Sequence, residues 1–235
     1  MEPTYSFDLL QLLSVPIPFD QQVLIFWLLF LGFAFKAPVF PFHTWLPDVL
    51  LEVPIGMAVV LAGLKLGTFG FIRFSIPLLP DASKSQTVVA ITMALGLTAI
   101  LYGAIMALVQ QDFRRLLAFS SISHLGFVVI GLFALNYQGL QGSLLTMINL
   151  GLSTAGLFFI AGFLYSRQQS TQLGSFDGMA KQTPLLASVF LFLGLASIGL
   201  PATNGFVAAF LLLFGHFKAH CLVCGAAVTV PVYRA

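Results

Sequence analysis

Two lysines lie inside long apolar runs of this sequence. Lys36 is embedded in FWLLFLGFAFKAPVFPF, and Lys65 is embedded in VVLAGLKLGTFGFI, where no polar boundary is close on either side. A charged group is costly in the hydrocarbon region of a membrane, so an ionisable residue there is by default a functional candidate. A lysine amine that loads and releases a proton at working pH suits a proton relay. The structural alternatives are that Lys36 extends to the membrane surface and that Lys65 pairs with an acidic neighbour.

Prolines follow the first of these lysines, at Pro38 and Pro41. Proline has no amide hydrogen and interrupts the helical hydrogen-bond ladder, so carbonyl groups beside Lys36 become free at membrane depth. Helices broken in this way line ion pathways in transporters. The sequence therefore predicts a discontinuous helix near Pro38, and a second one near Pro201 in the run LPATNG.

Further titratable residues lie at the edges of the apolar runs. His43, Asp48 and Glu52 belong to the block HTWLPDVLLE, which closes one apolar run and opens the next. They either serve proton uptake or coupling, or cap a helix. His124, in FSSISHLGFVVIG, titrates near neutral pH and is surrounded by hydroxyl groups. It is a candidate relay residue, with a packing histidine as the alternative.

The remaining polar residues favour structural roles. Arg114 and Arg115 lie at a run boundary and are explained by membrane topology and lipid headgroup contact. Cys221 and Cys224 form a single C-x-x-C without a second pair, which is a weak indication of a metal site. Nothing resembles a nucleotide-binding loop, an iron–sulfur cysteine set or a Ser-His-Asp arrangement. Any redox chemistry is therefore expected on other chains.

The composition indicates an integral membrane protein. Of the 235 residues, 59% are hydrophobic and 8% are charged, and the mean hydropathy is +1.00, whereas soluble domains carry about a quarter charged residues. Apolar stretches of roughly 20 residues match the thickness of a hydrocarbon core. Without an alternating short-strand pattern, the backbone must be satisfied in helices. The net charge of +2 is spread over the loops, which excludes a nucleic-acid-binding stripe.

The predicted fold is all-α, a polytopic transmembrane bundle of roughly six or seven spans. Residues 1–21 are predicted to form an extramembrane lead, residues 22–217 the bundle, and residues 218–235 a short tail. The last two spans are either separate or one long helix broken near Pro201. The predicted spans are 22–42, 54–79, 86–110, 115–135, 139–166, 184–200 and 204–217.

Basic residues predict the orientation, because Lys and Arg accumulate in short cytoplasmic loops. One side of the predicted bundle carries Arg114, Arg115, Arg167 and Lys181. The opposite side carries Lys84 and an N-terminal stretch that contains acidic residues but no Lys or Arg. The N-terminus is therefore expected to face the periplasm or lumen.

Three stretches resemble a known family: FAFKAPVFPFHTWLPD, LAGLKLGTFGFIRFSIPLLPDA and RRLLAFSSISHLGFVVIG. They are similar to chain 4 (subunit M), a proton-translocating, antiporter-like subunit of complex I and its photosynthetic NAD(P)H-quinone oxidoreductase relatives. The resemblance covers roughly residues 24–217 and implies a shortened member. It implies that Lys36 is the lysine at a helix break, that Lys65 is a central-axis lysine, and that His124 belongs to the same polar axis.

The resemblance also implies a cellular setting. The chain would be one subunit of an enzyme, translocating protons while electrons pass through partner subunits. It would carry no cofactor itself, with FMN and Fe-S clusters in partner subunits that also handle the quinone or plastoquinone. Its partners would be other membrane-arm subunits and the lipid bilayer, without nucleic acid. The location would be a bacterial cytoplasmic membrane or a photosynthetic thylakoid membrane.

This sequence departs from the family pattern at several positions. Leu150 stands where a MIAHGL-like run has histidine, and Ala209 stands where a GFVGEF run has an exit-side glutamate. The resemblance implies that this chain begins about halfway through the family's length, after the helices that precede the first broken helix and that include the one with the glutamate partnering the Lys36-type lysine. The segment before Lys65 is about two residues shorter than usual, a turn of roughly 200° on a helix. Either Lys65 is re-aimed, or a bulge absorbs the difference.

Two other functions remain open at this point. The large subunit of a multisubunit Na+/H+ antiporter shares the lysine axis and runs without a redox partner. A structural paralogue that fills the membrane arm without pumping is favoured by the losses at Leu150 and Ala209.

Overall fold

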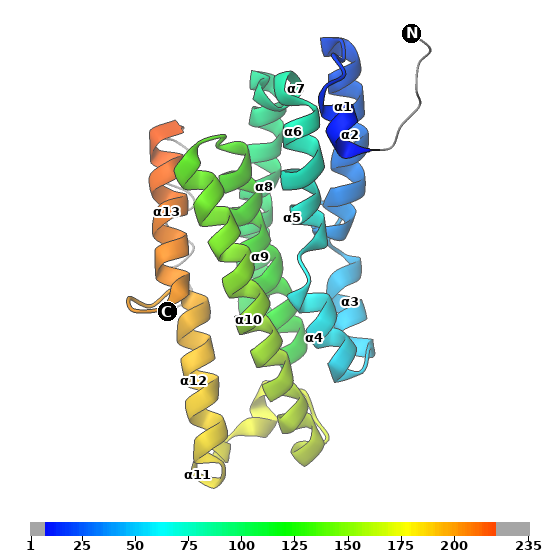
Figure 1. Cartoon of the computed structure of the whole chain (residues 1–235). Coiled ribbons are helices and arrows are strands. Elements are labelled where there is room, and N and C mark those ends of the chain that lie inside the picture. The colour runs from blue at the N-terminus through cyan, green and yellow to red at the C-terminus, as the bar shows by residue number, and fades with distance from the viewer. Residues whose placement is uncertain (1–7, 220–235) are drawn as a thin grey trace.

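The computed structural model describes residues 8–219, with side chains described as far as residue 215. Apart from one isolated bridge between Asp112 and Gln172, all regular structure in this part is helical. The helices lie roughly side by side along one long axis (Figure 1). The predicted all-α bundle is therefore confirmed. Cys221, Cys224 and nearly all of the predicted tail fall outside the described residues.

Five helical segments are long and apolar enough to cross a membrane. They are α2 (Phe19–Lys36), the combined segment Ile55–Leu78, α8 (Gln86–Val109), α9 (Phe113–Phe133) and α10 (Tyr137–Gln168). Two shorter apolar helices follow, α12 (Pro184–Ile198) and α13 (Asn204–Ala219). Each lies within a few residues of a predicted span.

Short helices connect or extend these segments. They are α1 (Leu9–Leu13), α3 (Trp45–Glu52), α7 (Pro80–Lys84), the three-ten turn η2 (Leu173–Phe176) and α11 (Met179–Gln182). The combined segment Ile55–Leu78 consists of α4 (Ile55–Gly63), α5 (Leu66–Gly70), the π-helical stretch η1 (Phe71–Ser75) and α6 (Ile76–Leu78).

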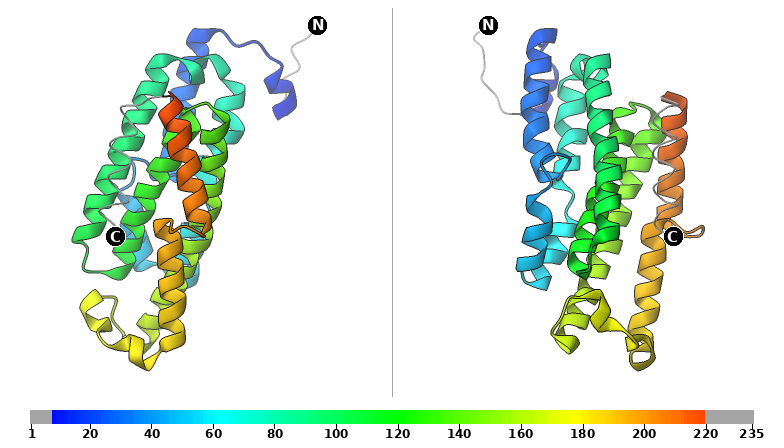
Figure 2. Two further views of the ribbon diagram at one scale, coloured as in Figure 1. Left: turned by 90° about the vertical axis from the view of Figure 1, so that its left-hand side faces the viewer. Right: turned by 180° about the vertical axis from the view of Figure 1, so that it is seen from behind.

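Both predicted discontinuities are present. After Lys36 the chain leaves the helix and resumes as α3 at Trp45. Between α12 and α13 the helix is interrupted, with Gly199 at φ +87° and Ala202 at φ +81°. Helices α12 and α13 follow one another lengthwise beside α10 as one broken rod (Figures 1 and 2).

A third break was not predicted. The predicted span over 54–79 is confirmed as the apolar segment Ile55–Leu78, but inside it the helix unwinds at Leu64 (φ −79°, ψ 111°) and Lys65 (φ −96°, ψ 49°). The break therefore lies at the position of the candidate lysine. The five-residue π-helical stretch η1 follows shortly afterwards.

Helix α9 forms the centre of the bundle and is its most buried span. It approaches α8 closely because glycines face each other across the contact. A Cβ atom on Gly126 would lie 2.7 Å from the carbonyl oxygen of Gly96, and one on Gly103 would lie 2.7 Å from the amide nitrogen of Ser123. Small residues thus allow the close helix packing that membranes favour. This position brings α9 against both halves of the bundle.

The loops that carry the basic residues lie together at one end of the bundle. The α3–α4 turn, the α8–α9 turn and the connection from α10 to α12 lie at one end, and α7 with Lys84 lies at the other (Figure 2). The Asp48 carboxylate accepts a hydrogen bond from Arg115 at 2.9 Å. The Phe113 amide donates to the Thr171 carbonyl at 2.9 Å. Which side of the membrane this end faces stays a prediction.

Candidate proton-transfer site

Two helix breaks touch each other in the first half of the bundle. Gly67, in the first turn of α5, packs directly on the break that follows α2. A Cβ atom at Gly67 would lie 2.5 Å from the amide nitrogen of Ala37 and 2.6 Å from the carbonyl oxygen of Phe33. Real Cβ atoms do not approach backbone so closely, so this contact requires glycine. The breaks beside Lys36 and at Lys65 are thereby held together.

The first break is stabilised by hydrogen bonds that replace the helical ladder. The Ala37 amide still donates to the Phe33 carbonyl at 2.7 Å. The Phe35 carbonyl instead accepts a bond from the indole Nε1 of Trp45, at the start of α3, at 3.0 Å. Trp45 therefore ties the two halves of the broken helix together. It satisfies the Phe35 carbonyl, whose usual helical donor, the Val39 amide, donates to the Ala34 carbonyl instead at 3.0 Å.

Lys65 lies at the second break and is partly buried. Its Nζ donates to the carbonyl of Ala62 in the preceding helix, and Thr68 Oγ1 donates to the carbonyl of Lys65 at 2.9 Å. Among the described side chains, the one ion pair is formed by Arg115 and Asp48, and Lys65 takes part in none. The alternative in which Lys65 pairs with an acidic neighbour therefore finds no support among residues 8–215.

Lys36 is the last residue of α2, and its side chain is exposed on the surface of the described bundle. It also lines a cavity of about 20 Å³ together with Lys65. The cavity walls come from both breaks, through Pro38 and Thr68 among others, and from α9 through Ser121. The structure thus brings together two of the three predicted relay residues.

Ser121 is a residue of this site that the sequence interpretation missed. Its side chain is 1% exposed, and its Oγ has no hydrogen-bond partner. The only signal in the sequence was the run of hydroxyl residues before His124, which did not distinguish Ser121 from Ser120 or Ser123.

His124 lines a different cavity, of about 60 Å³, beside the break between α12 and α13. Leu150 and Ala209, the two positions that the sequence resemblance predicts to depart from the family pattern, line the same cavity. Asn149 contributes a polar group there, and its Nδ2 donates to the Ala196 carbonyl at 3.4 Å. The three relay candidates therefore occupy two cavities, and α9 contributes to both.

The candidates for proton uptake or coupling do not form one cluster. His43 is buried between the rings of Phe40 and Tyr102, with centroid distances of 5.5 and 4.7 Å, and its Nδ1 has no partner. Asp48 is exposed and paired with Arg115, and Glu52 is exposed at the end of α3. Asp48 lies in the first turn of α3, where a carboxylate interacts favourably with the helix dipole.

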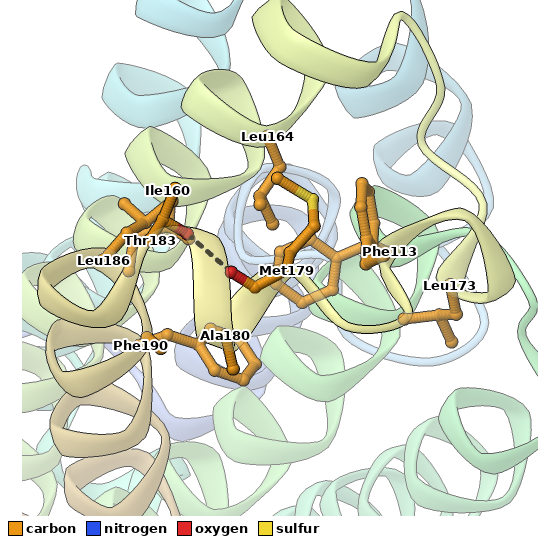
Figure 3. Close-up of a pocket in the computed structure, with 11 residues that line it drawn as sticks. Phe113, Ile160, Leu164, Leu173, Met179, Ala180, Thr183, Leu186 and Phe190 are labelled. Carbon is orange, nitrogen blue, oxygen red and sulfur yellow. Dashed lines mark hydrogen bonds between the residues drawn. The ribbon is translucent and has the colours of Figure 1, made fainter.

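A separate apolar pocket of about 280 Å³ lies at the basic end, between α10, α11 and α12 (Figure 3). Its one polar side chain, Thr183, donates to the Met179 carbonyl at 3.1 Å, which Figure 3 marks as a dashed line. No relay candidate lines this pocket. It therefore offers no chemistry comparable to that of the lysine cavity. Among the described residues, no group of three or more His, Cys, Asp or Glu side chains could hold a metal ion.

Comparison with known proteins gives the family of this bundle. Residues 3–232 match the family described as NADH:quinone oxidoreductase/Mrp antiporter, TM. The chain is 40% identical over 231 residues to NADH-quinone oxidoreductase subunit M of Rickettsia typhi, covering 96% of this chain and 46% of that protein. It is 39% identical to NADH-ubiquinone oxidoreductase chain 4 of Marchantia polymorpha, covering 94% of this chain and 44% of that protein.

Solved structures agree with this relationship. A chain of respiratory complex I from Thermus thermophilus aligns with a TM-score of 0.93 at 37% identity, over 98% of this chain and 49% of that chain. A chain of the Mrp complex from Dietzia shares the fold, with a TM-score of 0.85 at 22% identity over 96% of this chain and 45% of that chain. The chain thus spans about half the length of the relatives it matches. It belongs to the integral membrane family of NADH:quinone oxidoreductase and Mrp antiporter subunits and is similar to subunit M.

Proposed function

We propose that this chain forms part of the proton-translocating membrane arm of a NADH-quinone oxidoreductase, with Lys36, Lys65 and His124 as relay residues. The observation that carries the proposal is that two helix breaks meet and place both lysines on one small cavity. Broken helices with a titratable side chain are typical of ion pathways. Subunit M and chain 4 relatives near 40% identity support the assignment to such a complex.

The geometry suits a stepwise transfer between charged groups. A protonated Lys65 is held by its hydrogen bond to the Ala62 carbonyl. Because Lys36 lines the same cavity, positive charge on one lysine disfavours positive charge on the other. A proton arriving at Lys36 therefore drives Lys65 to release its own. His124, on the neighbouring cavity, is the next group able to accept a proton along α9.

Electron transfer belongs to partner subunits in this proposal. FMN, Fe-S clusters and the quinone site would lie on other chains, and this chain would contact the other membrane-arm subunits and lipid. The relatives named above include a bacterial subunit M and a liverwort chain 4 named for ubiquinone. They give no support for a thylakoid location or plastoquinone, so we assign the chain to a respiratory complex. The end with Arg114, Arg115, Arg167 and Lys181 would face the cytoplasm.

The large subunit of a sodium/proton antiporter is the second candidate. It is favoured by the shared fold of the Mrp complex, but at 22% identity that likeness concerns the fold alone. Copurification with quinone-reducing subunits would favour the first candidate, and ion transport without them would favour the second. A non-pumping structural paralogue is the third candidate. It is favoured because Leu150 and Ala209, which stand where the resemblance implies titratable residues, line one cavity and give it apolar surface.

Substitution of the two lysines tests the proposal. Lys36→Ala and Lys65→Ala are introduced into the assembled complex, and the rate of proton movement is measured in proteoliposomes. We expect each variant to lower proton movement by about 100-fold, the scale of a lost acid–base group. Lys84→Ala, at the far end of the bundle, is the matched control and should pump normally. Normal pumping by both Lys36→Ala and Lys65→Ala would refute the relay assignment.

A further inference from the structure

The cavity between the two lysines has room for one water molecule. Its volume of about 20 Å³ exceeds the roughly 10–15 Å³ that a water requires. Such a water also needs about two to four polar partners. Four of its lining residues carry polar side chains: Lys36, Lys65, Thr68 and Ser121. The cavity therefore has the size and the polar residues that a bound water requires.

The buried hydroxyl of Ser121 has no hydrogen-bond partner, and such a water would supply one. A buried hydroxyl without a hydrogen bond is unfavourable because it has lost its bonds to water, and buried polar groups are rarely left in that state. Among the described side chains, buried atoms without a partner also occur in His43, Ser75 and Arg114. Of these residues, only Ser121 lines the lysine cavity.

The position of Ser121 on α9 connects the two cavities. Ser121 and Leu125, one turn apart, face the lysine cavity, while His124 and Phe127 face the second cavity. On a helix, residues three apart are neighbours with Cβ atoms about 5–6 Å apart. Ser121 is therefore placed one helical turn from His124, between the lysines and the histidine.

We propose that Ser121 is a further relay residue, whose hydroxyl binds a single water between Lys36 and Lys65 and passes protons on towards His124. The proposal rests on the proposed function of the lysines. In one transfer the water donates a proton to Ser121 Oγ while Ser121 gives up its own hydroxyl proton towards His124. The water regains a proton from Lys65, whose amine becomes neutral. Ser121 and the water end unchanged, and one proton has moved from Lys65 to His124.

Ser123 provides a matched control on the same helix. Its side chain is 0% exposed, but its hydroxyl already donates to the Ile100 carbonyl at 3.0 Å, and it does not line the lysine cavity. Ser123→Ala removes a buried hydroxyl of equal size from α9. Any loss that follows simply from deleting a buried serine should appear in both variants.

The experiment compares Ser121→Ala, Ser123→Ala and Lys65→Ala in the assembled complex, with the rate of proton movement as the readout. We expect Ser121→Ala to lower that rate by roughly tenfold, the scale of one lost hydrogen bond in the transfer step, and Ser123→Ala to leave it unchanged. Equal losses in both serine variants would overturn the proposal. Normal pumping by Ser121→Ala while Lys65→Ala is impaired would also overturn it and leave the proposed function standing. Normal pumping by Lys65→Ala would overturn this proposal, and normal pumping by Lys36→Ala as well would overturn the proposed function.

A second measurement does not depend on pumping or on the assembly of variants. High-resolution electron microscopy of the unmodified complex should show one water within hydrogen-bond distance of Ser121 Oγ. Absence of that density would overturn the proposal.

Discussion

The two broken helices share an architecture but differ in the groups around them. The break after α2 opens on a cavity of about 20 Å³ with two lysines and an unpartnered hydroxyl. The break between α12 and α13 opens on a cavity of about 60 Å³ whose one ionisable lining residue is His124. Leu150 and Ala209 complete the second cavity with apolar surface. A broken helix thus exposes backbone in either case, and the neighbouring side chains decide whether a charge can be held there.

Glycine makes both breaks possible in the same physical way. Gly67 allows α5 to touch the first break, and Gly205 allows α13 to touch the end of α12. A Cβ atom at Gly205 would lie 2.3 Å from the Ala196 carbonyl oxygen and 3.1 Å from Asn149 Nδ2. The two regions therefore share a close backbone contact at glycine, and they differ in cavity size and in side-chain chemistry.

The largest expected effect is a difference in proton movement between variants of the relay residues in the two regions. We expect Lys65→Ala to lower the rate of proton movement by about 100-fold, and His124→Ala to lower it clearly less. The reason is space: the second cavity has room for several waters that can bridge a missing histidine, whereas the first has room for one. The rate of proton movement in proteoliposomes measures both. An equal loss in the two variants would contradict this difference between the regions.

The next effect tests whether the two breaks must touch. Gly67→Ala would force a methyl group against the backbone of Ala37, which we expect to destabilise the protein by about 1–3 kcal/mol. Thermal unfolding of the assembled complex measures the change. Gly56→Ala is the matched control, because its Cβ would meet nothing within 4 Å, and alanine favours a helix by about 1 kcal/mol over glycine. A Gly67→Ala variant as stable as Gly56→Ala would show that the contact is not needed.

A smaller effect is expected from restoring charge to the second region. Ala209→Glu adds a carboxylate to the cavity that contains His124. If Ala209 only slows the release of protons from this cavity, the new carboxylate should raise proton movement severalfold. Unchanged proton movement would favour a different exit route. Ala208→Glu is not a useful control because Ala208 is 2% exposed; Val207→Glu, which is exposed, serves instead.

The spans and two of the breaks could be predicted because their causes are local. Apolar length marks each span, and Pro38 and Pro201 mark the two breaks. The break at Leu64 and Lys65 has no proline and lies in an unbroken apolar run, so no local signal marks it. Its cause is tertiary, in the contact between Gly67 and the first break.

The unwinding also changes the length of this segment. An extended residue rises by about 3.3 Å and a helical residue by about 1.5 Å, so the extended Leu64 (ψ 111°) adds about 1.8 Å. That gain is less than the roughly 3 Å that about two missing helical residues would remove. Both alternatives for this segment, a re-aimed Lys65 and a local irregularity, therefore stay predictions.

The site was predictable only where residue type alone is unusual. A lysine in an apolar run is conspicuous, and both lysines meet at one cavity. Ser121 is not conspicuous, since serines are common in membrane helices and Ser123 on the same helix has an ordinary hydrogen bond. His43, Asp48 and Glu52 lie within ten residues of one another in the sequence. In the fold, however, His43 is buried and the two carboxylates are exposed.

The smallest expected effect concerns the ion pair that links α3 to the start of α9. The side chains of Arg115 and Asp48 are 45% and 69% exposed, so Arg115→Ala should destabilise the protein by less than about 1 kcal/mol. Arg114→Ala should be worse, because that guanidinium is buried, donates to the Leu51 carbonyl at 3.0 Å and lies over the Tyr165 ring. Thermal unfolding compares the two variants.

Pumping by the same two variants then decides the role of Asp48. If the pair is only structural, Arg115→Ala should pump normally, because freeing an exposed carboxylate leaves the lysine cavity intact. If Asp48 takes up protons for the first region, removing its positive partner changes the charge at the point of uptake. Arg115→Ala would then alter the rate of proton movement while hardly changing stability, an outcome that no packing role of this exposed pair would produce.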